Sequence, residues 1–442
     1  MFNKPLSKII LADVQQLVEE RKEKEGQHLD YKRELSGSDR DKREFLKDVT
    51  AFANSGGGYL IIGADEKTST VCGTQDAVGN QKIEEWISNV LTPNIDQKVR
   101  YEIQLLPFED RKTVIVLHIP ESPRKPHMVT LEAKNAYYVR HNVVIHAATH
   151  NEVREMFEMS RRSKDAVREF MEQRNLLDDK SEHFAQNENT PKLKERIGED
   201  MKTPLLLHSF IPLYLQEDQV KTASAEFDQW LQEHASGYEP LSGVRLYKPY
   251  GKQVHLEGIV LPEILPRSQD EEEVYYNYLE ILNNGYIESG ASSEFLWDRN
   301  RSFTQEGQPR KVLPALAMTQ AVAYTWALLN FALTLYRKIE YLDEVTMQLS
   351  LANIRSFALG SFAKGWAEPF TWEYENPPLC KRYDNLRLVE RFVVGEMSED
   401  AVRATITSLA EKLSHAFGET RVKCFDAEGE LNPECIRGFR SY

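Results

Sequence analysis

The apolar positions just after residue 40 predict a helix that is followed directly by a buried strand. Phe45, Val49 and Phe52 recur at helical spacing, which indicates an amphipathic helix ending near Asn54. The glycine run at 56–58 ends this helix, because glycine adopts positive φ and permits close backbone approach. The continuous apolar run that follows, through Ile62, is typical of a strand covered on both faces.

A short alternating segment precedes this helix. Its pattern places His28, Asp30 and Lys32 on one face of an extended strand and Leu29 and Tyr31 on the other. The sequence therefore predicts one polar face and one apolar face.

The rest of the first 160 residues continues as a mixture of helices and strands. Thr149 and Glu152 form a capping-box pattern for the last of these helices. The expected helices span 11–24, 80–91 and 151–159, and the expected strands span 101–108, 113–119 and 136–141. We expect the second helix to stop before Pro93, because proline disfavours helical geometry at the residue before it.

A charged, helix-permissive stretch at 161–202 predicts a domain boundary. The fold class is predicted as α+β: an N-terminal mixed α/β domain at 1–160, the connector, and a second α+β domain at 203–442 with long C-terminal helices. In the second domain we expect strands at 205–215, 244–247, 254–261, 273–289, 345–351 and 386–394, and helices at 223–232, 313–339 and 399–417.

Charge is distributed unevenly between these parts. The chain of 442 residues has a net charge of −14, and its first 160 residues carry 22 Lys and Arg against 25 Asp and Glu. The acidity thus belongs mainly to the C-terminal part. This argues against a globally basic nucleic-acid binder, but a nearly neutral domain can still carry a basic groove.

The four cysteines are widely spaced and form no disulfide framework or CxxC metal motif. Together with the lack of any run of 18 apolar residues, this predicts a soluble cytoplasmic protein without a membrane partner. The chain also lacks GxxxxGK[ST], so nucleotide binding through a P-loop is not expected.

The segments ExxxxDYK and KDVTAFANSGGGYLIIGADE resemble the AlbA-type domain of the Schlafen family across about residues 20–160. In the Schlafen proteins that cleave RNA, the active site contains three acidic residues. The matching positions here are Glu25, Asp30 and Asp65, with Lys32 at the lysine that follows the second acid and Glu66 competing for the third place. The resemblance implies that the three acids bind Mg²⁺ or Mn²⁺ and that Lys32 assists catalysis. Without the resemblance, two acids near a lysine indicate an ordinary salt-bridged surface.

Other residues are candidates for nucleic-acid contacts. We expect Arg33, Arg124, Lys125 and Arg140 to contact phosphates, and the backbone at Gly57 to form an anion-binding nest. The glycine run is equally explained as a helix-to-strand turn.

Two further groups allow a functional and a structural interpretation. His141, His146 and His150 are spaced like metal ligands, although surface or capping roles are commoner. The tyrosines at 275, 276, 278 and 286 could stack on bases, although core packing is the commoner use.

The resemblance implies a metal-dependent endoribonuclease that cleaves structured RNA such as tRNA. Schlafen cores pair two related lobes around the RNA, and this chain shows one recognisable lobe. The resemblance therefore implies that a homodimer or larger homo-oligomer supplies the second lobe, and by family association it implies a toxin-like or phage-defence effector. The alternative is a non-catalytic nucleic-acid-binding transcriptional regulator, and a third hypothesis is an ATP-binding signalling protein.

Overall fold

The computed structural model describes residues 2, 4, 6–133, 135–174, 176, 205–215, 218–235, 252–264, 275–291, 296–297, 301–305, 308–312, 315–360, 378–420, 422 and 424–425. The chain forms two compact units, Met1–Ser163 and Lys164–Tyr442. The boundary lies inside the long helix α4 (His150–Gln173), which continues beyond the end expected at residue 159. Among the described residues, no helix combines the length and apolar character that a membrane span needs.

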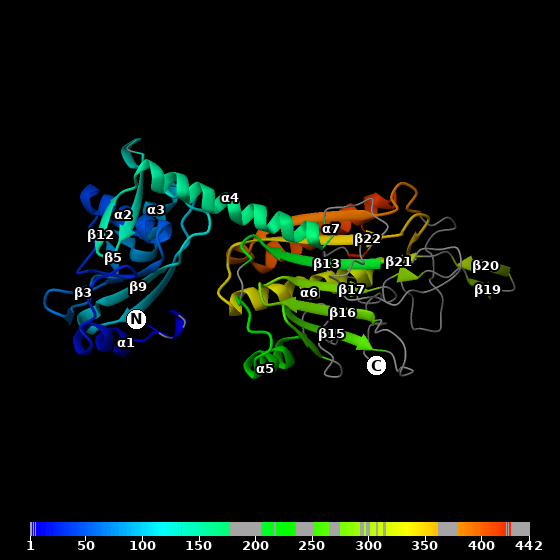
Figure 1. Ribbon diagram of the computed structural model, residues 1–442, viewed down its shortest axis with the longest axis horizontal. Helices are drawn as coiled ribbons and strands as arrows, with labels where there is room; N and C mark the ends of the chain where they lie inside the picture. The colour runs from blue at the N-terminus through cyan, green and yellow to red at the C-terminus, as the bar shows by residue number, and fades with distance from the viewer. Residues whose placement is uncertain are drawn as a thin grey trace. The chain divides into compact units, whose positions relative to one another are not determined.

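The N-terminal unit contains a mixed four-stranded sheet (Figure 1). Its strand order is β1-β2-β9-β8, with β1 (Leu29–Lys32) parallel to β2 (Gly58–Ile62) and the other pairs antiparallel. Strands β8 (Glu102–Pro107) and β9 (Thr113–Ile119) form the hairpin expected from the sequence. Helix α2 connects the two parallel strands, because such strands need a crossover rather than a tight turn.

Helix α2 (Asp39–Asn54) forms the centre of the N-terminal unit. The Ser38 side chain caps its start by accepting from the Asp41 amide, and the predicted apolar stripe of Phe45, Val49 and Phe52 is fully buried. This stripe packs with α3 (Ile83–Asn94) and with one face of the sheet. Helix α3 passes through Pro93, contrary to the expected stop, since a proline in the last turn removes only one backbone hydrogen bond.

The other face of this sheet is covered by the N-terminal segment. Strand residues Leu29, Tyr31 and Ile61 pack there with Val14 and Leu17, which confirms the apolar face of the predicted alternation. The first helix is shorter than expected, since α1 (Leu11–Gln15) continues only as a π-helical turn to Glu20.

A second, antiparallel sheet lies against α2, in the order β12-β11-β10-β7. Its strands are β7 (Ile95–Asp96), β10 (Met128–Val129), β11 (Ala136–His141) and β12 (Val144–Ala147). Two small hairpins complete the unit: β3 (Ala64–Asp65) with β4 (Thr70–Val71), and β5 (Ala77–Val78) with β6 (Gln81–Lys82).

The C-terminal unit is built on a seven-stranded antiparallel sheet, ordered β14-β15-β16-β17-β13-β22-β24. The strands are β13 (Leu205–Pro212), β14 (Gln253–His255), β15 (Gly258–Ile264), β16 (Tyr275–Leu282), β17 (Ile287–Ala291), β22 (Glu344–Ala352) and β24 (Leu386–Val393). The smaller pairings of this unit involve β18 (Leu296–Trp297), β19 (Arg301–Gln305), β20 (Gln308–Val312), β21 (Ala315–Ala317) and β23 (Ala358–Gly360).

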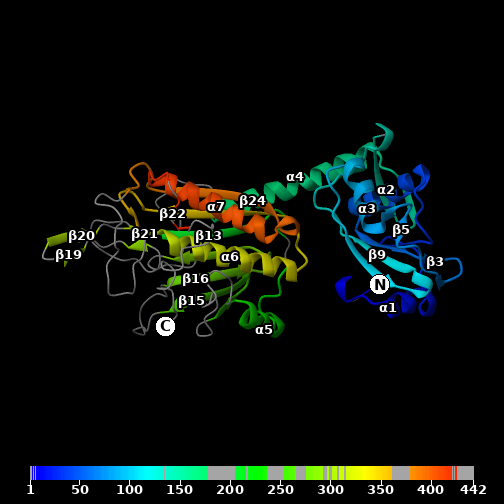
Figure 2. The same cartoon turned by 180° about the vertical axis from the view of Figure 1, so that it is seen from behind.

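Helices α6 (Met318–Lys338) and α7 (Glu399–Ala416) cover one face of the large sheet, as the view from behind shows (Figure 2). Helix α5 (Ala225–His234) adds to the same core. Both units mix helices with largely antiparallel sheets, so the α+β prediction is confirmed.

Two expected strands of this unit are themselves hairpins. The segment predicted as a strand at 273–289 contains β16 and the start of β17, which pair across the turn between Leu282 and Ile287. The segment predicted as a strand at 254–261 turns back between His255 and Gly258, which pair across β14 and β15. A Cβ at Gly258 would lie 2.2 Å from the Ile281 carbonyl oxygen, so only glycine fits beside β16. The strand expected at 244–247 lies outside the described residues.

The opposite face of the large sheet carries a row of buried polar side chains. Glu280, Glu288, Ser209 and Gln348 are neighbours across four strands. Arg174, just after α4, forms ion pairs with both glutamates, so the chain that follows α4 is fixed to this row. Tyr278 and Tyr286 are buried and donate to Glu288, so the structure gives these two tyrosines a packing role and not base stacking.

Candidate acidic centre and its surroundings

Glu25 and Asp30 lie together at the start of β1. The Tyr31 amide donates to both, over 2.9 Å to Asp30 Oδ1 and 3.3 Å to Glu25 Oε1. Partial burial, with a hydrogen bond to Asp30 and repulsion from its charge, raises the pKa of Glu25 to about 7. Two carboxylates that share a confined space cannot both ionise easily, and a bound cation or a retained proton relieves the repulsion.

The structure does not bring Asp65 to this pair. Asp65 Oδ1 accepts from the amides of Lys67 and Thr68, and Oδ2 lies 3.8 Å from Arg33 Nη1. Asp65 therefore stabilises the β3–β4 turn, because an aspartate commonly binds backbone amides two or three residues on. Glu66 turns toward the pair instead, and its Oε1 accepts from the Glu25 amide over 3.1 Å. Glu66 is thus the further acid that contacts Glu25, while the assignment of Asp65 as the third acid stays a prediction.

Lys32 faces a different acid from the one expected. Its Nζ lies 2.5 Å from Asp48 Oδ2, on helix α2, and Asp48 is buried. Burial alone would lower the pKa of Lys32, but the negative charge of Asp48 raises it. Burial in turn raises the pKa of Asp48 to about 6, against the opposing effect of Lys32. Lys32, whose side chain is 26% exposed, is hence a partly buried counter-ion that joins β1 to α2, and its catalytic role stays a prediction.

Arg140 is a buried anchor beneath the acid pair. Its side chain is 1% exposed, and Nη1 donates to Asp30 Oδ2 over 2.9 Å. The same guanidinium donates to the carbonyls of Gly26, Asn142 and Leu29 and stacks over the Phe52 ring. Because the side chain is 1% exposed and each of its three nitrogens donates to a protein oxygen, the structure gives Arg140 an anchoring role instead of the predicted phosphate contact.

Lys125 is also used internally. It is 7% exposed, and its Nζ donates to the Ser55 carbonyl and pairs with Glu121. A cation at this place satisfies a carbonyl at the end of α2, as lysine often does at helix C-termini. The predicted phosphate contact at Lys125 is therefore corrected to a helix cap.

The backbone at Gly57 does not form an anion nest. Its amide donates to the Phe52 carbonyl, and its carbonyl lies 2.9 Å from His28 Nδ1. With φ at +69° and a Cβ position 2.4 Å from the Glu121 amide nitrogen, the site accepts only glycine. The turn explanation of the glycine run is confirmed.

Of the predicted phosphate contacts, Arg33 is the most exposed. Its side chain is 74% accessible beside Asp65. Arg124 is half-buried, and its amide donates to Ser122 Oγ. Arg33 is therefore the predicted phosphate contact whose side chain is most open to solvent.

Comparison with known families gives one clear match in this unit. Residues 25–148 match the family model described as Schlafen, AlbA_2. This segment is a Schlafen AlbA_2 domain. The match begins at Glu25 and includes Asp30, Tyr31 and Arg140. It suggests a nucleic-acid-binding family.

Other comparisons add little to the Schlafen match. No curated protein matches the chain. Among solved structures, the DIP2311 protein from Corynebacterium diphtheriae is similar to 29% of this chain, at 18% identity and a TM-score of 0.23. The matched part is 23% of that protein, so the chain spans under a quarter of its length.

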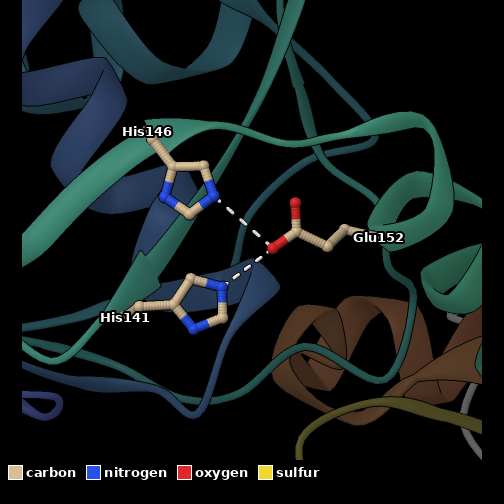
Figure 3. Close-up of side chains that lie close together, drawn as sticks. All are labelled: His141, His146 and Glu152. Atoms are coloured by element: carbon tan, nitrogen blue, oxygen red, sulfur yellow. Dashed lines mark hydrogen bonds and ion pairs between the residues drawn. The ribbon is translucent and has the colours of Figure 1, made fainter.

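The Schlafen domain ends beside a second cluster of possible ligands. His141 on β11, His146 on β12 and Glu152 on α4 have ligand atoms within 4.8 Å of one another, and this is the group of three such residues found in the described parts of the chain (Figure 3). His150, the third histidine of the predicted spacing, is not a member. Hydrogen bonds from His141 and Thr149 lower the pKa of Glu152 to about 2.

Sequence reasoning missed several residues that organise the Schlafen domain. The side chain of buried Asn54 donates to the carbonyls of His127 and Tyr138 and accepts from the His127 amide. The pairing of Asp48 with Lys32 could not be predicted from a sequence motif, since the two residues lie on different elements. An acid on the buried side of an amphipathic helix was the available signal, because such a residue needs a counter-ion.

Proposed function

We propose that the Schlafen domain is a divalent-metal-dependent endoribonuclease acting on structured RNA such as tRNA, with Glu25 and Asp30 at its centre. The observation that supports this most is the contact between the two carboxylates; burial of Glu25, together with this contact, raises its pKa to about 7. Strongly perturbed acids of this kind are concentrated at functional sites. The family match supports nucleic acid as the substrate class.

The donor chemistry of the pair fits Mg²⁺ or Mn²⁺. These hard ions take oxygen ligands, and Mg²⁺ is usually held by one or two carboxylates while waters and substrate phosphates complete its shell. Glu25 and Asp30 would hold the ion, and Glu66 lies close by, with its Oε1 3.1 Å from the Glu25 amide nitrogen. When bound, the ion supplies Lewis-acid stabilisation of the charge that develops on phosphate oxygens.

The protein's own contribution is to orient these carboxylates. Arg140 fixes one oxygen of Asp30 from below, and the Tyr31 amide fixes the other. The same amide donates to Glu25, so both carboxylates are positioned by the backbone of β1. Arg33 is the exposed cation that would approach a phosphate next to this centre.

The test uses the purified full chain with tRNA and Mn²⁺, with and without EDTA. We expect EDTA-sensitive cleavage that is abolished in Glu25→Gln and in Asp30→Asn. Asp65→Asn is the matched control, because an asparagine keeps the turn hydrogen bonds, and it should retain cleavage. Full activity of both Glu25→Gln and Asp30→Asn would exclude these acids from the mechanism.

The second candidate function is a non-catalytic nucleic-acid-binding regulator. It is favoured by the ion pair between Asp30 and Arg140, which gives Asp30 a complete structural role. RNA or DNA binding without EDTA-sensitive cleavage, together with loss of binding in Arg33→Ala, would support this function over the nuclease.

The proposal includes the setting in which the enzyme acts. Cys72 and Cys380 are free thiols, which supports a reducing, cytoplasmic compartment. We further propose assembly into a homodimer or larger homo-oligomer, in which the second copy completes the RNA-binding surface, and a role as a toxin-like or phage-defence effector. Sedimentation of the full chain with and without tRNA tests the assembly.

A further inference from the structure

The cluster of His141, His146 and Glu152 has the geometry of a small transition-metal site. Its three side chains come from the end of β11, from β12 and from the first turn of α4. In the antiparallel register, His141 pairs with Val144 and Val139 with His146, so the two histidines are diagonal neighbours on one face. Their rings stack at 5.1 Å between centroids.

Both histidines direct the same ring nitrogen toward one carboxylate oxygen (Figure 3). The Nε2 of His141 lies 2.8 Å from Glu152 Oε1, and the Nε2 of His146 lies 3.5 Å from it. In a tetrahedral zinc site with bonds of about 2.0 Å, neighbouring ligand atoms lie about 3.3 Å apart. The cluster therefore needs only small side-chain movements to admit an ion.

The remaining oxygen of Glu152 is held by the protein. Thr149 donates to Oε2 from its amide over 2.7 Å and from its hydroxyl over 2.8 Å. The capping box thereby fixes the carboxylate and leaves Oε1 directed at the histidines. Groups that orient a ligand from behind in this way are a regular feature of protein metal sites.

We propose that His141, His146 and Glu152 bind Zn²⁺ with an open fourth position, and that the ion links the β11–β12 hairpin to the first turn of α4. Two imidazoles and a carboxylate suit zinc, whereas Mg²⁺ prefers oxygen ligands alone. The side chains of His141 and His146 are 67% and 39% exposed, so the ion and a ligand in its fourth position have access from solvent. This site is separate from the acid pair and does not depend on the nuclease proposal.

The experiment measures Zn²⁺ binding to the EDTA-treated, dialysed full chain by calorimetry, and the visible absorption of the Co²⁺-substituted protein. We expect one zinc ion per chain and the intense absorption of four-coordinate Co²⁺. His141→Ala and His146→Ala should each weaken zinc binding at least tenfold and remove the Co²⁺ absorption. His150→Ala, a neighbouring histidine outside the cluster, should change neither.

Two further variants separate ligation from folding. Glu152→Gln retains the capping box, because glutamine also serves at this position, but it loses the anionic ligand and should bind zinc at least tenfold more weakly. Asp30→Asn should bind zinc as the wild type does, whatever its effect on RNA cleavage. Zinc should also raise the melting temperature of the wild type but not of His141→Ala. The proposal is overturned if the wild type binds zinc no more tightly than the double variant H141A/H146A.

Discussion

Replacing Arg140 by methionine tests whether this residue is a structural anchor or a phosphate contact. Methionine is long enough to keep the packing against Phe52 but cannot pair with Asp30. The substitution leaves the Asp30 carboxylate, only 12% exposed, without its counter-ion. It also removes donors from the carbonyls of Gly26, Leu29 and Asn142.

The expected loss is large for a single substitution. Breaking a buried ion pair by removing one partner costs about 3–5 kcal/mol, because the remaining charge stays desolvated. The lost hydrogen bonds act in the same direction. Since whole domains are stable by only about 5–15 kcal/mol, Arg140→Met should bring the N-terminal unit close to its unfolding threshold.

The assay is hydrogen exchange with mass spectrometry in increasing urea, following peptides from β1, β2 and α2, so that the unfolding free energy of this unit is measured separately. Asp30→Asn in the Arg140→Met background should recover part of the lost stability, because the uncompensated charge is gone. Arg33→Met is the exposed control and should change the unfolding free energy by less than about 0.5 kcal/mol.

RNA binding at several salt concentrations completes the test. Losing one phosphate contact reduces the slope of log affinity against log salt concentration by about 1. Under the nucleic-acid proposal, Arg33→Met should show this reduction and Arg140→Met should not. Unchanged unfolding together with a reduced salt dependence in Arg140→Met would refute the anchor assignment.

Three other perturbations follow from the same structure. The raised pKa of Glu25, about 7, means that Mn²⁺ should bind more tightly at pH 8 than at pH 6, because the metal competes with the proton; equal affinities by calorimetry would contradict this. The stability of the metal-free protein should change in the opposite direction. Between the usual and the raised pKa of Glu25 the folded state binds one more proton than the unfolded state, so the free energy of unfolding should fall as pH rises through that range. Arg174→Met should cost the C-terminal unit about 3–5 kcal/mol in urea unfolding, because both partner carboxylates are buried. Its exposed control, Arg168→Met, should cost less than about 1 kcal/mol, and equal losses would refute the argument. Gly57→Ala should lower the melting temperature more than Gly79→Ala, because both have positive φ but only Gly57 has backbone where the methyl group would lie.

Local pattern was sufficient for most elements and for the apolar faces. The stripe of Phe45, Val49 and Phe52, the strand after the glycine run and the capping box of Thr149 and Glu152 can be recognised because their interactions lie within a few residues. The family resemblance implied that Glu25 and Asp30 share a site, and the structure brings these two acids together.

The partners of the charged residues were decided only by the tertiary structure. Lys32 meets Asp48, Asp30 meets Arg140, and Glu66 contacts the Glu25 amide, because each pairing depends on how separate elements pack. A charge that becomes buried must find a counter-ion, and the sequence indicates this need without indicating which distant residue will meet it. The cluster proposed to bind zinc arises in the same way, since strand register and helix packing, rather than histidine spacing, brought Glu152 to its two histidines.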